Sequence, residues 1–443
     1  MTSHEEVRVV LAEVHRREWA RVLAATVRLA GDLDLGEECA QDAFVVALQT
    51  WPRDGIPRSP GAWLTTAARR KVLDAHRRAG ALRGRLPLLL EPYAEQDLAA
   101  DARLTDMDEI PDDRLRLVFT CCHPALAREA QVGLTLRLVC GLSTAEVAHA
   151  FLVSEPTMAA RVTRAKKKIS AAGIPDRVPA AHELPDRLDA VLTVVHLVFT
   201  TGHTAPTGDR LTRPDLVARA VDLARVLAEL MPDEREARGL LALLLLTDAR
   251  HATRVDAAGR LVLLQDQDRS RWDRDLIEQG RALVLGALRG GRPGRFVLQA
   301  AIAALHAEAP TWAETDWPQV VQLYDLLLLA WPSPVVALNR AAALSFRDGP
   351  AAGLAALDAL EGLDQGPLAT SHYLPAARAD LLRRLDRPGE AAASYRLALG
   401  LVDNEVERSF LQGRLAALST PHAASGVVGP GAGNGLTPGG HRS

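Results

Sequence analysis

Residues 136–169 read LRLVCGLSTAEVAHAFLVSEPTMAARVTRAKKKI, a stretch that predicts two short helices joined by a tight turn. Ser143 can cap the first helix, and Glu146 three positions later completes a capping box. Ser154 can cap the second helix, where Pro156 falls in the first turn and its missing N–H costs little. The second helix then carries an apolar stripe at helical spacing, formed by Met158, Val162, Ala165 and Ile169.

Most side chains off this stripe are polar or basic, which is typical of a helix-turn-helix whose second helix enters the major groove of DNA. The alternative is an ordinary amphipathic helix pair with a solvated basic end. Thr157 and Arg161 are the best candidates for contacts to base edges, because they lie near the start of the second helix. The full set of predicted DNA contacts is Ser154, Glu155, Thr157, Met158, Arg161, Arg164, Lys166, Lys167 and Lys168.

Composition limits the possible classes of protein. The chain has 443 residues, of which 48% are hydrophobic, so two to four domains with packed cores are expected. A net charge of −3 excludes a wholly basic DNA-coating protein, so DNA contacts must come from local clusters. The N-terminus lacks an apolar signal core and the apolar runs are too short to span a bilayer, which predicts a cytoplasmic protein without a membrane partner.

The cysteines predict neither a disulfide framework nor a metal site. Cys39, Cys121, Cys122 and Cys140 show no Cys-x-x-Cys spacing, which fits a reducing compartment. Cys121 and Cys122 precede His123, but adjacent helical residues point in different directions and cannot easily share one ion. We therefore expect buried structural cysteines and no metal or cofactor.

The first 80 residues predict three helices. Residues 5–30 have one apolar face, and residues 34–50 form a second helix whose outer face is acidic. The following segment, WPRDGIPRSP, holds three prolines and a glycine and is expected to be a loop. Ser59-Pro60 then opens a third helix, GAWLTTAARRKVLDAHRR, with a strongly basic outer face.

The order of helix, acidic helix, proline loop and basic helix resembles region 2 of a bacterial sigma factor of the extracytoplasmic-function (ECF) type. The residues that carry the resemblance are GDLDLGEECAQDAFVVALQTWP and SPGAWLTTAARRKVLDAHRR, and the helix-turn-helix lies where region 4 belongs. The resemblance covers about residues 5–172 and implies region 2 in residues 1–80, a linker in 81–107 and region 4 in 108–172.

The resemblance also implies partners, namely core RNA polymerase, through its β′ clamp and β flap, and promoter DNA. The acidic helix would dock on the clamp through Asp34, Glu37, Glu38, Gln41, Asp42 and Phe44, unless it is simply a solvated face. The loop and basic helix would capture and hold the melted −10 element through Arg53, Arg58, Ser59, Trp63, Arg69, Arg70, Lys71, Arg77 and Arg78. Trp63 can stack a base but falls among inward-facing residues, and the loop is otherwise a plain connector. The helix-turn-helix would read the −35 element.

Residues 185–418 extend the chain well beyond such a factor and predict further helices near residues 186–200, 213–231, 234–249 and 274–288, with 261–264 as a short strand or extended segment. From Trp317 onward the spacing of Val320, Tyr324 and Leu327 is repeated by Ala391, Tyr395 and Ala398, which resembles tetratricopeptide repeats. Residues 405–418 would cap the stack, and the Gly/Pro-rich residues 419–443 are expected to be disordered.

Two polar features of the extension stay open. The patch DQDRSRWD at residues 266–273 predicts either a ligand or metal pocket or a salt-bridge network that supports the fold. Relatives in the TPR-bearing ECF subgroup tend to have YLVFNEGY where this chain has HLVFTTGHT, so any function of that motif is in doubt. The resemblance implies that the extension regulates activity, through another protein or an intramolecular contact.

These observations predict an all-α protein with two small sigma domains followed by a TPR-like helical-repeat domain. The leading function is an alternative sigma factor that performs no covalent chemistry. The alternative is a helix-turn-helix regulator with a ligand- or protein-sensing helical domain, which would not need the acidic helix, the proline loop and the basic helix. An enzyme is disfavoured because no nucleophile–base constellation, phosphate loop or HExxH motif is present.

Overall fold

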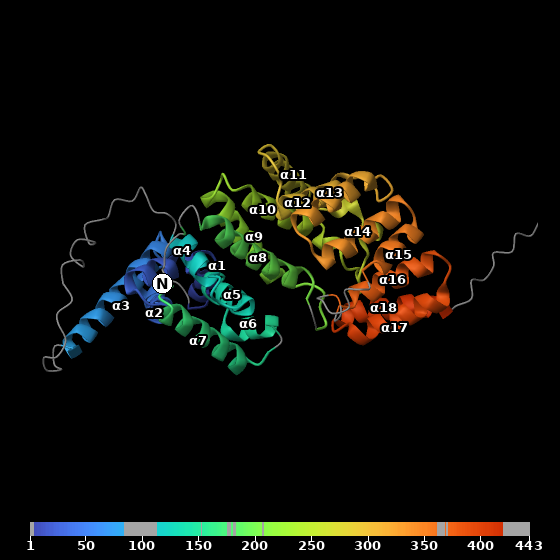
Figure 1. Cartoon of the computed structure of the whole chain (residues 1–443). Helices are drawn as coiled ribbons and strands as arrows, with labels where there is room; N and C mark the ends of the chain where they lie inside the picture. Colours follow the sequence, from blue (N-terminus) through green and yellow to red (C-terminus); the bar gives the residue numbers. More distant parts are fainter. Residues whose placement is uncertain are drawn as a thin grey trace, which may run out of the picture.

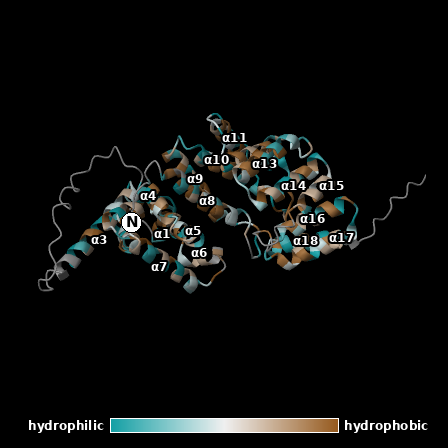
Figure 2. Cartoon of the chain, viewed as in Figure 1, coloured by the Kyte–Doolittle hydropathy of each residue, from teal (hydrophilic) through white to brown (hydrophobic). Residues whose placement is uncertain are grey.

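The computed structural model describes residues 4–83, 113–151, 153–174, 179, 183–205, 208–360, 368 and 371–419. Over these residues the chain is all-α, as predicted, with isolated β-bridges in place of sheets. Figure 1 shows an N-terminal lobe next to a long curved extension of helices, and Figure 2 shows hydrophilic and hydrophobic residues alternating along most helices. The predicted linker beyond residue 83 and the predicted tail beyond residue 419 lie outside the described residues.

The first lobe begins with a bundle of three helices, α1 (His4–Ala30), α2 (Leu33–Asp54) and α3 (Pro60–Arg83). Asp32 caps α2 by accepting a hydrogen bond from the Leu35 N–H at 2.8 Å. Gly36 lets α2 approach α1 closely, because a Cβ at this position would lie 2.8 Å from the Cα of Val27. The bundle core therefore depends on a glycine as well as on the apolar faces.

The proline-rich loop is shorter than the sequence predicts. Helix α2 runs through Trp51 and Pro52 to Asp54, and Gly55 ends it with a φ of 84°. Trp51 and Pro52 are buried, and the Gly55 N–H donates to the Trp51 carbonyl at 2.9 Å. Packing of the Trp51 side chain thus outweighs the one helical hydrogen bond that a proline cannot donate. The loop proper covers residues 55–59.

The second part of the lobe contains α4 (Asp113–Cys121), α5 (Arg128–Leu134), a π-helical turn η2 (Thr135–Val139), α6 (Thr144–Phe151) and α7 (Glu155–Ala171). The predicted capping box is present, since the Ser143 N–H donates to Glu146 Oε2 at 2.7 Å and the Glu146 N–H donates to Ser143 Oγ at 3.1 Å. Ser154 caps α7 through the Thr157 N–H. Helices α6 and α7 are therefore the predicted helix-turn-helix.

The extension begins with α8 (Leu184–His203), α9 (Pro214–Leu230), α10 (Arg235–Asp248), the short turns η3 (His251–Thr253), η4 (Leu264–Asp266) and η5 (Arg269–Arg271), α11 (Arg274–Leu288) and α12 (Arg295–Glu308). Gly239 brings α10 against α12, because a Cβ there would lie 2.7 Å from the backbone nitrogen of Val297. Residues 261–264, expected as a short strand or an extended segment, form no more than a single bridge between Val255 and Leu261. Helix α12 is not among the helices predicted from the sequence.

Successive helices then pack side by side: α13 (Trp317–Ala330), α14 (Pro334–Arg347), α15 (Pro350–Asp358), α16 (Tyr373–Arg384), α17 (Pro388–Leu401) and α18 (Glu405–Ser419). This arrangement gives the TPR-like helical repeat that was predicted. Asn404 lies between α17 and α18 near the end of the extension and is fully buried. It donates to the carbonyls of Ala205 and Arg210, between α8 and α9, at 3.0 Å each, and so connects the end of the extension to its beginning. None of the helices in the described ranges is long and apolar enough to cross a membrane.

Candidate DNA and polymerase interface

Helix α7 presents most of the predicted −35 residues to solvent. Ser154, Glu155, Thr157, Arg164, Lys167 and Lys168 are exposed, and Arg161 is partly buried. The Thr157 hydroxyl lies 2.8 Å from Ser154 Oγ, so the cap also orients the side chain predicted to read a base. The exposed row fits a helix that lies along a negatively charged duplex.

Met158 does not belong to this surface, and its predicted DNA contact is wrong. The side chain is 1% exposed and packs into the core beneath α7. The apolar stripe that holds Met158, Ala165 and Ile169 faces inward, as helical spacing requires. Met158 thus supports the recognition helix rather than contacting DNA.

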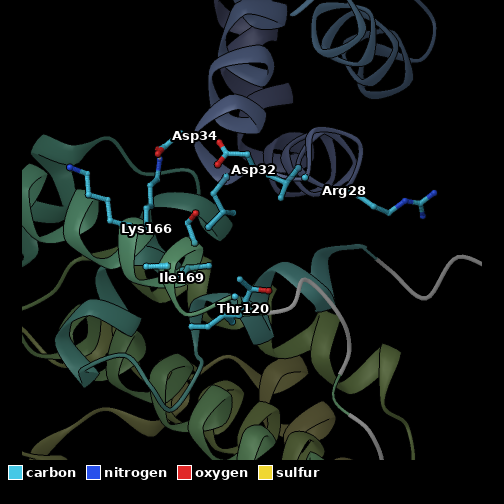
Figure 3. Close-up of a pocket in the computed structure, with 14 residues that line it drawn as sticks. Arg28, Asp32, Asp34, Thr120, Lys166 and Ile169 are labelled. Carbon is cyan, nitrogen blue, oxygen red and sulfur yellow. The ribbon is translucent and has the colours of Figure 1, made fainter. Parts of the chain in front are cut away.

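Lys166 is directed at the first lobe's acidic helix instead of at solvent. Its Nζ donates to Asp34 Oδ1 at 2.7 Å and to Glu37 Oε2 at 2.6 Å, and its side chain is only 10% exposed. Burial lowers the pKa of Lys166, but the hydrogen bonds to the two carboxylates outweigh burial, so the net shift is upward. Figure 3 shows Lys166 and Asp34 meeting across a groove of about 740 Å³ between α1, α2 and α7.

Glu37 is the centre of this contact, which corrects its prediction as a free polymerase-binding residue. It is 7% exposed and pairs with Lys166 of α7 and Arg137 of η2. Gln41 also donates to Glu37 Oε1 at 3.0 Å. A buried carboxylate needs such partners, and here two cations from the predicted region 4 supply them. In this conformation, therefore, a predicted −35 contact and a predicted polymerase contact neutralise each other.

Phe44 is also misplaced by the prediction. It is 8% exposed and meets the rings of His15 and Trp19 at centroid distances of 5.1 and 5.8 Å. Trp19 in turn donates from Nε1 to the Leu138 carbonyl at 3.0 Å, which joins α1 to η2. Phe44 therefore belongs to the core that holds the two parts of the lobe together. The helical spacing of Phe44 predicts an inward-facing side chain, and the structure agrees with that spacing.

The exposed face of α2 keeps some of the predicted residues and adds apolar ones. Glu38 and Gln41 are exposed, and Val45 and Leu48 follow at helical spacing with exposures of 50% and 40%. Exposed large apolar side chains next to acidic and polar ones are typical of a protein-binding surface. Helical spacing predicts an inward position for Leu48, because an apolar residue at that spacing can belong to a core face or to a docking face.

Helix α3 and the loop before it keep their basic character in the structure. The exposed predicted residues are Arg53, Arg58, Ser59, Arg69, Arg70, Arg77 and Arg78. Lys71 pairs with Asp42 of α2 at 3.0 Å, which joins another predicted DNA contact to another predicted polymerase contact. Trp63 is partly buried and packs edge-to-face on Trp51 with the ring centroids 5.5 Å apart. Trp63 therefore stiffens the start of α3, and only part of its ring is open to a base.

The extension touches both parts of the lobe through arginines. Arg187 of α8 donates to the Phe119 carbonyl of α4 at 2.7 Å, and Arg128 of α5 donates to the Ala190 carbonyl of α8 at 3.4 Å. Arg219 of α9 donates to the Arg16 carbonyl of α1 at 2.5 Å. One hydrophobic core also runs without a break from α1 into α12. The extension and the lobe thus pack against each other around a shared core. No single sequence motif predicts this packing.

The polar patch at residues 266–273 forms caps and backbone contacts. Asp268 accepts from the Ser270 N–H at 3.0 Å, and Asp273 caps α11. Arg269 donates to the carbonyls of His306 and Ala309, at 2.5 and 2.7 Å. The predicted salt-bridge network is therefore replaced by bonds to backbone groups.

The cysteines are reduced and buried, as expected. Burial raises the pKa of Cys122 to about 11 and that of Cys140 to about 12, so both thiols stay protonated. Within the ranges that the structure covers, no three His, Cys, Asp or Glu side chains gather in a way that could hold a metal ion. Cys121 and Cys122 belong to the core of the lobe.

Comparison with known proteins identifies the parts of the chain. The model of sigma-70 region 2 matches residues 15–81, that of sigma-70 region 4 matches residues 116–169, and a family of unknown function (DUF6596) matches residues 187–288. An uncharacterized protein of Rhizobium meliloti (strain 1021) is 42% identical over 404 residues, which cover 91% of this chain and 94% of that protein. Yeast Tom70 aligns over 94% of this chain and 85% of its own at 11% identity with a TM-score of 0.36.

The matched residues coincide with units of the structure. Region 2 covers the bundle of α1, α2 and α3, and region 4 ends within the recognition helix α7. Both units of a promoter-recognising factor are thus present in the order that such a factor requires, which implies contacts with core RNA polymerase and promoter DNA. The chain belongs to the sigma-70 family, in a form that carries a C-terminal helical extension.

Proposed function

We propose that this chain is an alternative sigma factor of the ECF type that binds core RNA polymerase and directs it to a promoter with −10 and −35 elements. The exposed basic face of α3 would hold the melted −10 strand, and the exposed start of α7 would read the −35 element. The row of Glu38, Gln41, Val45 and Leu48 on α2 would dock on the β′ clamp. These surfaces lie on separate helices, so the β′ clamp, the −10 strand and the −35 element can be bound at the same time.

The observation that carries the proposal is the contact between α7 and α2. Lys166 is bound to Asp34 and Glu37, and Lys71 is bound to Asp42, so two basic residues of the proposed DNA surfaces are held by carboxylates of α2, the helix that carries the docking row. Core polymerase would compete for α2 and separate it from α7. We infer that the free protein is held closed and that binding to polymerase exposes the −35 reader.

The extension would regulate this opening. Arg219 of the extension is hydrogen-bonded to α1, and Arg187 is hydrogen-bonded to α4. The extension would therefore hold both parts of the lobe in the arrangement in which α7 contacts α2. A change in the shape of the extension would therefore alter how readily α7 leaves α2. This intramolecular contact supplies a route for regulation that needs no membrane-bound partner.

The test is transcription by sigma-free core polymerase reconstituted with the full chain on genomic fragments. We expect promoter-specific transcripts, and more of them from the Arg219→Ala variant because one fixing contact is lost. The matched control is Arg225→Ala, an exposed arginine on the same helix. Specific DNA binding without any transcript would instead identify a helix-turn-helix regulator and reject the proposal.

A further inference from the structure

A polar cavity lies inside the extension, away from the sigma surfaces. It has a volume of about 260 Å³ and opens between α8, α10, α12, α13 and α14. Taking about 30 Å³ for a water-sized group, this is room for roughly nine of them. Most of its lining is apolar, and the polar side chains for which we call it the polar cavity include His196, Arg250, Tyr324 and Asn339.

His306 also lines the cavity, and its ring nitrogen Nδ1 is buried without a hydrogen-bond partner among the described residues. Burial raises the pKa of Tyr324 to about 12 and lowers that of His196 to about 4, so at neutral pH both side chains are uncharged. Buried polar atoms in folded proteins are almost always satisfied, so the unpartnered His306 Nδ1 needs an explanation. A bound molecule with hydrogen-bonding oxygens would supply a partner for it.

Arg250 gives the cavity its charge preference. Burial lowers its pKa to about 10, and the neighbouring charge that acts on it, Arg269, has the same sign. Arg269 donates its hydrogen bonds to the carbonyls of His306 and Ala309. Arg250 has no carboxylate partner in the described part of the chain. A poorly solvated guanidinium without a counter-ion is costly, and its planar donors match a carboxylate or phosphate.

A second, larger cavity adjoins the first. Its volume is about 760 Å³, and it shares Leu264, Val335 and Asn339 with the smaller one. The larger cavity follows the inner face of the repeat helices and is lined by aromatic side chains such as Trp312 and Phe346. An apolar body could therefore continue from the polar cavity without leaving the protein.

We propose that the extension binds a small organic anion, with a carboxylate or phosphate group on Arg250 and Tyr324 and an apolar body along the inner face of the repeats. This inference does not depend on sigma activity, because binding is measured on the free protein. If the extension holds α7 against α2, binding of such a molecule to the extension would change how readily α7 leaves α2.

The test titrates the full chain with octanoate, octyl phosphate and 1-octanol. Because Trp272 and Trp331 line the smaller cavity, tryptophan fluorescence reports binding there, and calorimetry gives the stoichiometry. We expect saturable one-to-one binding of an anionic probe, and the tighter of the two anions distinguishes a carboxylate from a phosphate ligand. Arg250→Gln should weaken binding roughly tenfold or more, while Arg225→Gln should leave it unchanged.

Two further variants separate binding from folding. Arg250→Met should leave the melting temperature without probe unchanged or raise it, because an unpaired buried charge is removed. Tyr324→Phe should weaken binding without lowering the melting temperature, since the hydroxyl has no described partner. Octanol binding as tightly as the anions, no saturable binding of either anion, or a large loss of stability in Arg250→Met would overturn the proposal.

Discussion

Lys166 Nζ of the recognition helix α7 lies 2.6 Å from Glu37 Oε2 of the acidic helix α2. Two helices that we expect to bind different partners therefore contact each other. Arg137 approaches the same carboxylate from η2. The pair is well shielded from water, with side-chain exposures of 10% and 9%. Such a contact is hardly screened by salt, and removing the Glu37 charge leaves Arg137 without its carboxylate and Lys166 with Asp34 alone.

Glu37→Gln should therefore destabilise the closed lobe. It leaves Lys166 and Arg137 without their shared counter-charge, which costs about 3 kcal/mol of unfolding free energy. Urea unfolding measures this loss, and an electrophoretic shift assay should show stronger binding of promoter DNA by the free protein. Glu38→Gln, one position along and exposed, is the matched control. Equal stability of the two variants would mean that the contact is not formed in solution.

Met158→Ala should act on stability and not on base recognition. The side chain is 1% exposed beneath α7, so its truncation leaves a cavity and costs about 2–5 kcal/mol of unfolding free energy. Met158→Leu conserves the volume and should cost less than about 1.5 kcal/mol. Both variants, measured below their unfolding transitions, should keep the promoter preference of the parent. A changed base preference in Met158→Leu would show that the Met158 side chain contacts DNA after all.

Exposed residues of α7 should divide into phosphate and base contacts. Lys168→Ala should weaken binding of polymerase holoenzyme to all promoters alike and reduce the slope of log affinity against log salt by about one unit. Thr157→Ala should instead alter preference at one −35 base pair, by about 1–3 kcal/mol. Competition binding with single-base promoter variants, repeated over a range of salt, separates the two effects. A preference change in Lys168→Ala without a change in slope would reverse these assignments.

The sequence predicted the elements that local rules govern. The capping box of Ser143 and Glu146 and the cap at Ser154 follow from residues three positions apart, so they could be identified without a structure. The inward stripe of α7 follows from helical period in the same way. Region 2 and region 4 were likewise each placed from their own residues.

Contacts between distant elements could not be predicted in this way. Glu37 looks like any acidic surface residue until Arg137 and Lys166 are brought to it by the packing of α2 on η2 and α7. Phe44 has the same ambiguity, since an apolar residue on an amphipathic helix can face a core or a partner. The predicted site therefore fails where tertiary packing decides which face of a helix is covered.

Acid should loosen the extension at a pH where most carboxylates are still ionised. Burial lowers the pKa of both His196 and His306 to about 4, whereas in the unfolded chain each has an ordinary value near 6.5. As the pH falls from about 6.5 to 4, the unfolded chain therefore takes up protons that the folded chain does not. The free energy of unfolding should then fall with decreasing pH, by up to ~3 kcal/mol for each histidine.

Urea unfolding between pH 4.5 and 7, followed by far-UV circular dichroism, measures this slope. His196→Gln removes one of the two buried groups, so its stability should depend less steeply on pH than that of the parent. His251→Gln is the control, because the His251 side chain is 60% exposed and its replacement should leave the slope unchanged. If His196→Gln and the parent lose stability in parallel, His196 is not held neutral by burial, and the polar cavity of the extension is open to water.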